Sequence, residues 1–157
     1  MLRKSLFFTL ILSVLLASSG PCDAIVGVSL KLGGAFIPAD SRPGGLIQVD
    51  IGPLSPFAEL FKKSGITTVN SGVNFLLRAP SPVFTPYAGV GAGLSRASGG
   101  GASSSRALAN LLVGADIKLP GTVSFFGQVK YIYTFGSATF RVREVALQGG
   151  LRFNFGI

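Results

Sequence analysis

The sequence between residues 145 and 155, VALQGGLRFNF, decides the fold. Its odd-numbered positions are apolar except for Gly149, and its even-numbered positions are polar or small. Successive side chains of an extended strand point to opposite faces, so this alternation separates an apolar face from a polar one. The stretch therefore predicts a long amphipathic strand that borders two different environments.

The same alternation recurs along most of the chain after residue 24. Between residues 121 and 135 it lasts far longer than the ~5–6 residues usual for strands of soluble proteins. Two segments are less clear: residues 46–52 are short for a membrane crossing of about 9–11 residues, and residues 57–63 could equally form a helical turn. We expect eight strands, near residues 25–36, 46–52, 56–62, 67–78, 85–96, 106–118, 121–135 and 143–156.

The connectors between these segments are of two kinds. Three are tight and contain proline, at residues 52–56, 79–82 and 119–121. Two others, at residues 37–45 and 96–105, are more polar, and the second is rich in glycine and serine. Short turns that alternate with longer loops are typical of the two ends of an outer-membrane barrel.

Composition points the same way. Hydrophobic residues make up 48% of the 157 residues and charged residues only 13%, about half the charged share of a typical soluble domain. Beyond the N-terminus no run of 18 apolar residues occurs, so the sequence predicts no helical membrane span. In a membrane barrel only every second residue faces lipid, which accounts for high hydrophobicity without long apolar runs.

Residues 1–24 are predicted to be a secretory signal peptide. Arg3 and Lys4 precede an apolar stretch at 6–17, and Ala24 is a suitable cleavage position. Acylation of Cys22 is the alternative, which Pro21 disfavours. Cleavage after Ala24 removes the single cysteine, so stability would come from a closed sheet rather than from disulfides.

Two motifs resemble known families. Residues 148–155 fit the pattern polar-x-Gly-x-x-aromatic-x-aromatic and resemble the β-signal of outer-membrane barrels, although Gly156 and Ile157 follow where the family usually ends on the aromatic residue. Residues 85–94, TPYAGVGAGL, resemble the fifth strand of the OmpA-like and opacity-type barrels. The resemblance implies an all-β fold for residues 25–157, an eight-stranded antiparallel up-and-down transmembrane barrel in the outer membrane. It also implies that the barrel-assembly machinery reads Gln148, Gly150, Phe153 and Phe155.

The polar face of the predicted strands carries most of the charges. An eight-stranded barrel is just wide enough for side chains to fill, so we expect an interior polar network rather than the selectivity lining of a pore. Its predicted members are Lys31, Asp50, Arg78, Asp116, Lys130, Glu144 and Arg152. Aromatic residues are expected at the two membrane interfaces: Tyr131, Tyr133 and Phe135 at one, Phe153 and Phe155 at the other.

The sequence offers little for catalysis. It contains no histidine, so no Ser-His-acid triad is available, and the lipid A deacylases and palmitoyl transferases of similar architecture use a catalytic histidine. Few acids and no histidine also predict no metal site and no cofactor. No run of like charges exceeds two residues, so nucleic acid is not an expected partner.

Three functions follow as hypotheses. The first is a non-enzymatic outer-membrane barrel, expected to be a monomer, with a structural or surface-interaction role. Its expected partners are outer-membrane lipids, lipopolysaccharide phosphates that meet the excess of basic residues, and a host or surface ligand held by the loops. The second is a small porin or channel. The third is a secreted soluble barrel of the lipocalin type, whose outer face would need Lys and Glu.

Overall fold

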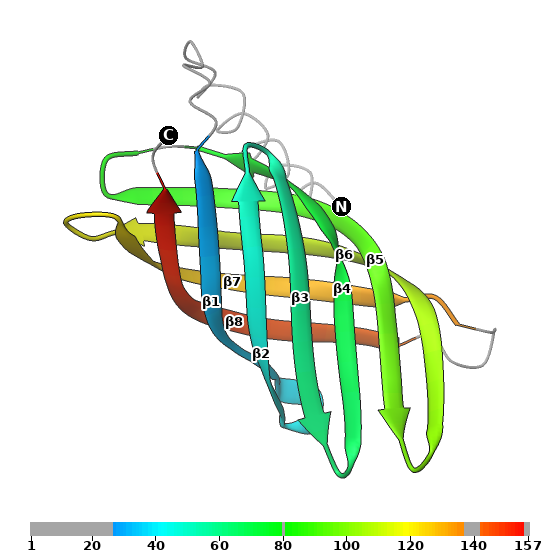
Figure 1. Ribbon diagram of the computed structural model, residues 1–157. Coiled ribbons are helices and arrows are strands. Elements are labelled where there is room, and N and C mark those ends of the chain that lie inside the picture. The colour runs from blue at the N-terminus through cyan, green and yellow to red at the C-terminus, as the bar shows by residue number, and fades with distance from the viewer. Residues whose placement is uncertain (1–26, 80, 137–141, 156–157) are drawn as a thin grey trace, which may run out of the picture.

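The computed structural model describes residues 27–79, 81–136 and 142–155, and these residues form eight antiparallel strands (Figure 1). Each strand pairs with the next, and β8 pairs with β1 to close the barrel. The predicted eight-stranded up-and-down barrel is thus confirmed, whereas the predicted signal peptide lies outside the described residues. The strands are β1 Val28–Ile37, β2 Arg42–Ile51, β3 Leu54–Lys63, β4 Ile66–Arg78, β5 Phe84–Gly99, β6 Ala102–Lys118, β7 Val123–Thr134 and β8 Val142–Phe155, with a 3-10 turn η1 at Pro38–Asp40 between β1 and β2.

The alternation of the sequence becomes the inside and the outside of the barrel. On β7, Phe126, Lys130 and Ile132 are buried in the interior, whereas Val129 and Tyr131 between them are exposed on the outer face. The other strands follow the same rule, and the register keeps inward residues opposite inward residues. One face of every strand therefore contributes to the core, and the other contributes to the outer surface.

The two segments that were hardest to assign from sequence are full strands of 10 residues each. β2 begins at Arg42 rather than near residue 46, and residues 57–63 continue β3 instead of forming a helical turn. The β2–β3 pairing lacks partners between Gln48–Phe57 and Ile51–Leu54. Pro56 lies in this gap and has no N–H to donate, which explains why the ladder is interrupted there.

The two ends of the barrel differ, but not as the sequence predicted. The base contains both chain ends of the barrel and the turns near residues 52–53, 79–83 and 119–122; the mouth contains η1 and the turns at 64–65 and 100–101. The prediction of long loops at 37–45 and 96–105 is wrong, because β5 and β6 extend to Gly99 and Ala102. Gly100 and Gly101 have φ values of 58° and 82°, which suits a two-residue hairpin turn.

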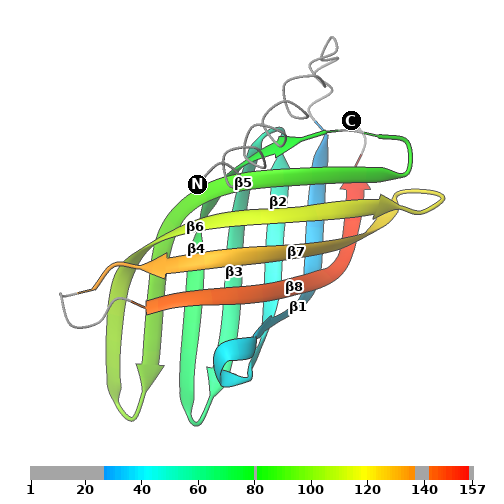
Figure 2. The ribbon, with the colours of Figure 1, turned by 180° about the vertical axis from the view of Figure 1, so that it is seen from behind.

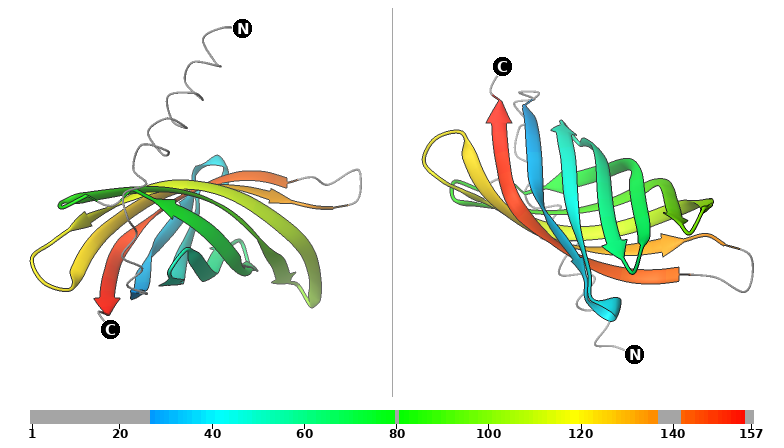
Figure 3. Two further views of the ribbon diagram at one scale, coloured as in Figure 1. Left: turned by 90° about the horizontal axis from the view of Figure 1, so that it is seen from above. Right: turned by 60° about the horizontal axis from the view of Figure 1, so that its bottom comes forward.

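The barrel has two walls whose strands cross. β1–β4 run steeply in one wall, and β7 and β8 run across behind them, as Figures 1 and 2 show from opposite sides. Figure 3 shows from above how strongly the sheet curves to connect the two walls. At the β1–β8 seam Gly33 pairs with Gly150, and at the β4–β5 seam Gly72 pairs with Gly93. These paired glycines let the backbones approach closely where the wall turns.

Replacing Gly72 by alanine is expected to lower the free energy of unfolding by about 1–3 kcal/mol, as overpacking typically does. The added Cβ would lie 2.2 Å from the carbonyl oxygen of Ala92. Gly34→Ala is the matched control, because its Cβ would meet nothing within 4 Å. Urea unfolding in lipid vesicles would measure both variants, and equal effects would contradict the seam interpretation.

Candidate functional site

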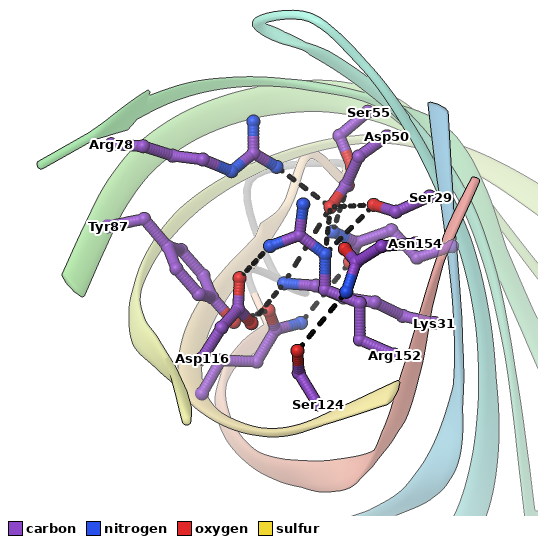
Figure 4. Close-up of polar contacts among 12 residues, drawn as sticks. Ser29, Lys31, Asp50, Ser55, Arg78, Tyr87, Asp116, Ser124, Arg152 and Asn154 are labelled. Atoms are coloured by element: carbon purple, nitrogen blue, oxygen red, sulfur yellow. Dashed lines mark hydrogen bonds and ion pairs between the residues drawn. The ribbon is translucent and has the colours of Figure 1, made fainter. Parts of the chain in front are cut away.

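The candidate site is the polar interior, and its largest cluster lies near the base. Five charged side chains from five strands meet there (Figure 4): Lys31, Asp50, Arg78, Asp116 and Arg152. Lys31 Nζ lies 3.1 Å from Asp116 Oδ1 and 3.9 Å from Asp50 Oδ2. Arg78 Nη2 lies 2.8 Å from Asp50 Oδ2, and Arg152 pairs with Asp116. We call these five residues the base cluster.

Asp50 is the centre of the base cluster. It accepts hydrogen bonds from Ser55 Oγ at 2.6 Å, Gln48 Nε2 at 3.0 Å and Ser29 Oγ at 3.3 Å. Three cations also face it, since Arg152 Nε lies 4.0 Å from Asp50 Oδ2. A carboxylate this deeply buried is tolerated only when it is paired and hydrogen-bonded, and here both conditions are met.

A second group lies in the middle of the barrel, and sequence reasoning found only half of it. Lys130 pairs with Glu59 on β3, and both side chains are 0% exposed. Gln148 Nε2 donates to Glu59 at 2.8 Å, and the Lys130 ammonium lies 3.6 Å from the centre of the Phe57 ring. Glu59 was missed because residues 57–63 could have been a helical turn. The inward positions of Phe57 and Phe61 on either side are the signal that would have found it.

The third group lies at the mouth. Glu144 Oε1 is 2.7 Å from Arg42 Nη2, which also contacts Asp40 Oδ2 at 2.5 Å. Lys63 Nζ is 3.7 Å from the same carboxylate oxygen. The hydrogen bond from Arg42 holds the pKa of Asp40 below its ordinary value, so this carboxylate stays ionised. Of the seven residues predicted as one network, five lie in the base cluster, Lys130 lies in the middle and Glu144 at the mouth. Hydrogen bonds through Gln48, Gln128 and Gln148 connect Asp50 to Glu59, so the first two groups form one network.

The interior is closed to water at the level of these groups. A water-filled channel would leave its wall accessible to water, but Lys31, Gln48, Asn74 and Lys130 are each 0% exposed. Above them, Phe61 and Ile132 belong to an apolar cluster that is also buried. The polar side chains thus fill the barrel rather than line a passage through it.

The outside of the barrel is apolar. Large exposed apolar side chains occur on all eight strands, among them Leu32, Ile47, Leu60, Phe75, Leu94, Leu111, Phe125 and Val145. Exposed apolar surface on this scale is unsuited to water, which argues against the soluble lipocalin-like alternative. Within the described residues there is no helix long and apolar enough to cross a membrane.

The residues of the predicted assembly signal all lie on β8. Gln148 and Gly150 face the interior, whereas Phe155 is exposed on the outer face. Phe155 pairs with Val28, and Phe153 pairs with Leu30 across the seam with β1 and with Val123 of β7. Recognition by the assembly machinery stays a prediction.

The predicted interface aromatics occupy two ends of the outer face. Tyr131, Tyr133 and Phe135 lie toward the mouth, with the rings of Tyr133 and Phe135 4.8 Å apart and edge to face. Phe153 and Phe155 lie near the base, where β8 ends. The two sets lie at opposite ends of the outer face, where membrane barrels carry their aromatic girdles. Their contact with lipid headgroups stays a prediction.

Comparison with solved structures identifies the fold. Neisserial surface protein A, NspA, is similar with a TM-score of 0.57 and 20% identity, over 82% of this chain and 95% of that chain. The N-terminal β-barrel domain of Pseudomonas aeruginosa OprF has a TM-score of 0.63 and 13% identity, over 83% of this chain and 98% of that chain. This chain is a small eight-stranded β-barrel of the outer-membrane type. The fold agrees with the outer-membrane location predicted from the sequence.

The outer-membrane enzyme PagL is also similar, with a TM-score of 0.47 and 12% identity over 83% of this chain and 99% of that chain. No protein-family model and no curated protein matches the sequence. Among the described residues of the barrel, no three side chains of the His, Cys, Asp or Glu type gather as they would around a metal ion.

Proposed function

We propose that this protein is a non-enzymatic, non-conducting barrel of the outer membrane with a structural and surface-interaction role. The observation that carries the proposal is the closed interior. The base cluster and the Lys130–Glu59 pair are both withdrawn from water, and their charges are paired across the barrel. An ion that crossed the barrel would have to break these pairs, which are strongly stabilised in a low-dielectric interior.

The proposal excludes catalysis on chemical grounds. The chain has no histidine, and the buried carboxylates Asp50, Glu59 and Asp116 are each held by a cation. Each of these carboxylates is 1% exposed and engaged by its cation, so a substrate has no access to it. The interior is therefore built for stability and not for reaction.

Reconstitution in planar bilayers tests the proposal against the porin alternative. We expect no ionic steps when the folded barrel is inserted at neutral pH, because the interior offers no wetted path. The folded state of each preparation is verified by its heat-modifiable mobility on gels. Regular conductance steps that scale with protein concentration would overturn the closed-barrel proposal and favour the channel.

Lipopolysaccharide is the partner that the outer surface fits. Among the described strand residues, the charged side chains on the outer face are Lys62, Arg96 and Arg143, all basic and all toward the mouth. Lys62 pairs with Thr67 of β4, and Arg96 pairs with Val69 two residues along the same strand. Exposed Leu60, Val69 and Leu94 lie next to them toward the base. Cations above an apolar surface suit the phosphates and acyl chains of a glycolipid.

Replacing Arg96 by glutamine is expected to reduce the stabilisation that lipopolysaccharide gives the barrel. Ligand that binds only the folded state raises stability, so the difference in unfolding midpoint with and without lipopolysaccharide reports binding. We expect this difference to fall measurably in Arg96→Gln and further in Lys62→Gln/Arg96→Gln. Lys118→Gln, which removes one charge at the base, should keep the wild-type difference. An equal loss of stabilisation in Lys118→Gln and Arg96→Gln would indicate that binding depends on the overall net charge rather than on Lys62 and Arg96.

A further inference from the structure

The mouth of the barrel holds a polar hollow above the closed interior. Two adjoining cavities of about 290 Å³ and 200 Å³ share Arg42 and Thr68. Together they reach the lower part of the range of ~300–1,000 Å³ that is usual for ligand sites. Their walls consist of Asp40, Arg42, Lys63, Ser64, Ile66, Thr68, Ser95, Ala97, Ser104, Arg106, Thr134 and Glu144, which we call the mouth cup.

A buried apolar layer lies below the mouth cup, so the cup is a hollow that ends within the barrel rather than the entrance to a passage. Ile37, Phe61 and Ile132 belong to one buried apolar cluster and are 0–2% exposed. These three residues are contributed by β1, β3 and β7, strands from both walls of the barrel. Phe61 and Ile132 lie one inward position below the cup residues Lys63 and Thr134, so this buried layer separates the cup from the polar interior.

Some charged side chains of the mouth cup have ion-pair partners, and one does not. Arg42 is neutralised by Asp40 and Glu144, and Lys63 contacts Asp40. Arg106 is a half-buried guanidinium that forms no ion pair with any residue the structure describes. It projects from β6 directly opposite Ser95 of β5, and the hydroxyls of Ser104 and Thr134 line the same cavity.

We propose that the mouth cup binds an acidic sugar, with Arg106 holding the acid group and the surrounding hydroxyls binding those of the ring. Arginine suits planar carboxylates and phosphates because its N–H groups donate two parallel hydrogen bonds. Ser95, Ser104, Thr68 and Thr134 each donate and accept, as sugar hydroxyls do. The inference names a ligand class for the surface-interaction role proposed above and rests on it.

The two tight turns described at this end leave the strand walls as the recognition surface for the proposed ligand. The sequence predicted that loops would carry any surface ligand, but the turns at residues 64–65 and 100–101 are tight. A ligand in the cup would instead contact β2, β4, β5, β6, β7 and β8. Side chains fixed on strands hold a ligand more precisely than those on mobile loops.

Titration calorimetry with digalacturonate, on the full folded barrel in detergent free of lipopolysaccharide, tests the proposal. We expect saturable binding, at least fivefold weaker for neutral galactobiose and for Arg106→Gln. Lys118→Gln, a charge-matched change at the opposite end, should bind digalacturonate as the wild type does. Ser104→Phe gives a second variant that fills the cup without changing charge, and it should also abolish binding.

A competition experiment identifies the source of the acidic sugar. If the sugar belongs to the core of lipopolysaccharide in the same membrane, added lipopolysaccharide with its core should compete with digalacturonate, whereas lipid A alone should not. If the sugar comes from another surface, neither should compete. Absence of digalacturonate binding, or equal binding in wild type, Arg106→Gln and Ser104→Phe, would overturn the acidic-sugar site. That result would leave the bilayer test of the closed barrel unaffected.

Discussion

Replacing Asp50 by asparagine should lower the free energy of unfolding by about 3–5 kcal/mol, the usual cost when one partner of a buried ion pair is removed. The variant leaves Lys31, Arg78 and Arg152 with Asp116 as the one remaining carboxylate of the base cluster. It also places an amide where three donors now point at carboxylate oxygens. Because Asp50 is 1% exposed, water does not compensate for the loss.

The measurement is urea unfolding in lipid vesicles, followed by the gel mobility of the folded form, since the chain has no tryptophan. Ser124→Ala is the control within the same region. It removes a buried hydroxyl that contacts Asn154 at 3.2 Å and carries no charge, so its effect should be near 1 kcal/mol. An Asp50→Asn effect no larger than that of Ser124→Ala would contradict the central role of Asp50.

The second large effect is expected at the Lys130–Glu59 pair, where each single variant should destabilise the barrel and the double variant should not. Glu59→Gln and Lys130→Met each leave one buried charge without its partner, and each should cost about 3–5 kcal/mol. The double variant removes both charges and keeps an oxygen that accepts from Gln148. It should therefore be close to wild-type stability.

A double-mutant cycle gives the coupling between these two residues directly. If the two single effects add in the double variant, Lys130 and Glu59 are not a coupled pair and the barrel centre is held by packing alone. The same four proteins should be examined in planar bilayers. The closed-barrel proposal expects the single variants to remain silent as long as Phe61 and Ile132 still fill the layer above.

The strands were predictable from sequence because a period of two is a local property. A strand with lipid on one side and a packed interior on the other must alternate, and residues 121–135 do so apart from Phe126 and Ile132 on the mostly polar face. The loops were less predictable, since glycine and serine occur both in loops and in exposed strand ends. Here Ser98 pairs with Ser103, so most of the polar segment at 96–105 continues the β5–β6 hairpin.

The interior groups were only partly predictable for a different reason. Alternation indicates that Lys31, Asp116 and Lys130 face inward, but their partners depend on the stagger of all eight strands. Lys31 on β1 meets Asp116 on β6 across the barrel, although the two residues are far apart in the sequence and their strands are not paired. Similarly, Lys130 on β7 meets Glu59 on β3, which no local pattern indicates.

The base cluster draws one charged side chain from each of β1, β2, β4, β6 and β8. A half-formed sheet of β1–β4 would bring Lys31, Asp50 and Arg78 into the bilayer without Asp116, which pairs with Lys31 in the finished barrel. Only the arrival of Asp116 and Arg152 completes the set, and Arg152 also donates to Ser29 on the first strand at 2.9 Å. Insertion of this barrel should thus be an all-or-none event, in which the final strand supplies the last member of the base cluster as it seals the seam.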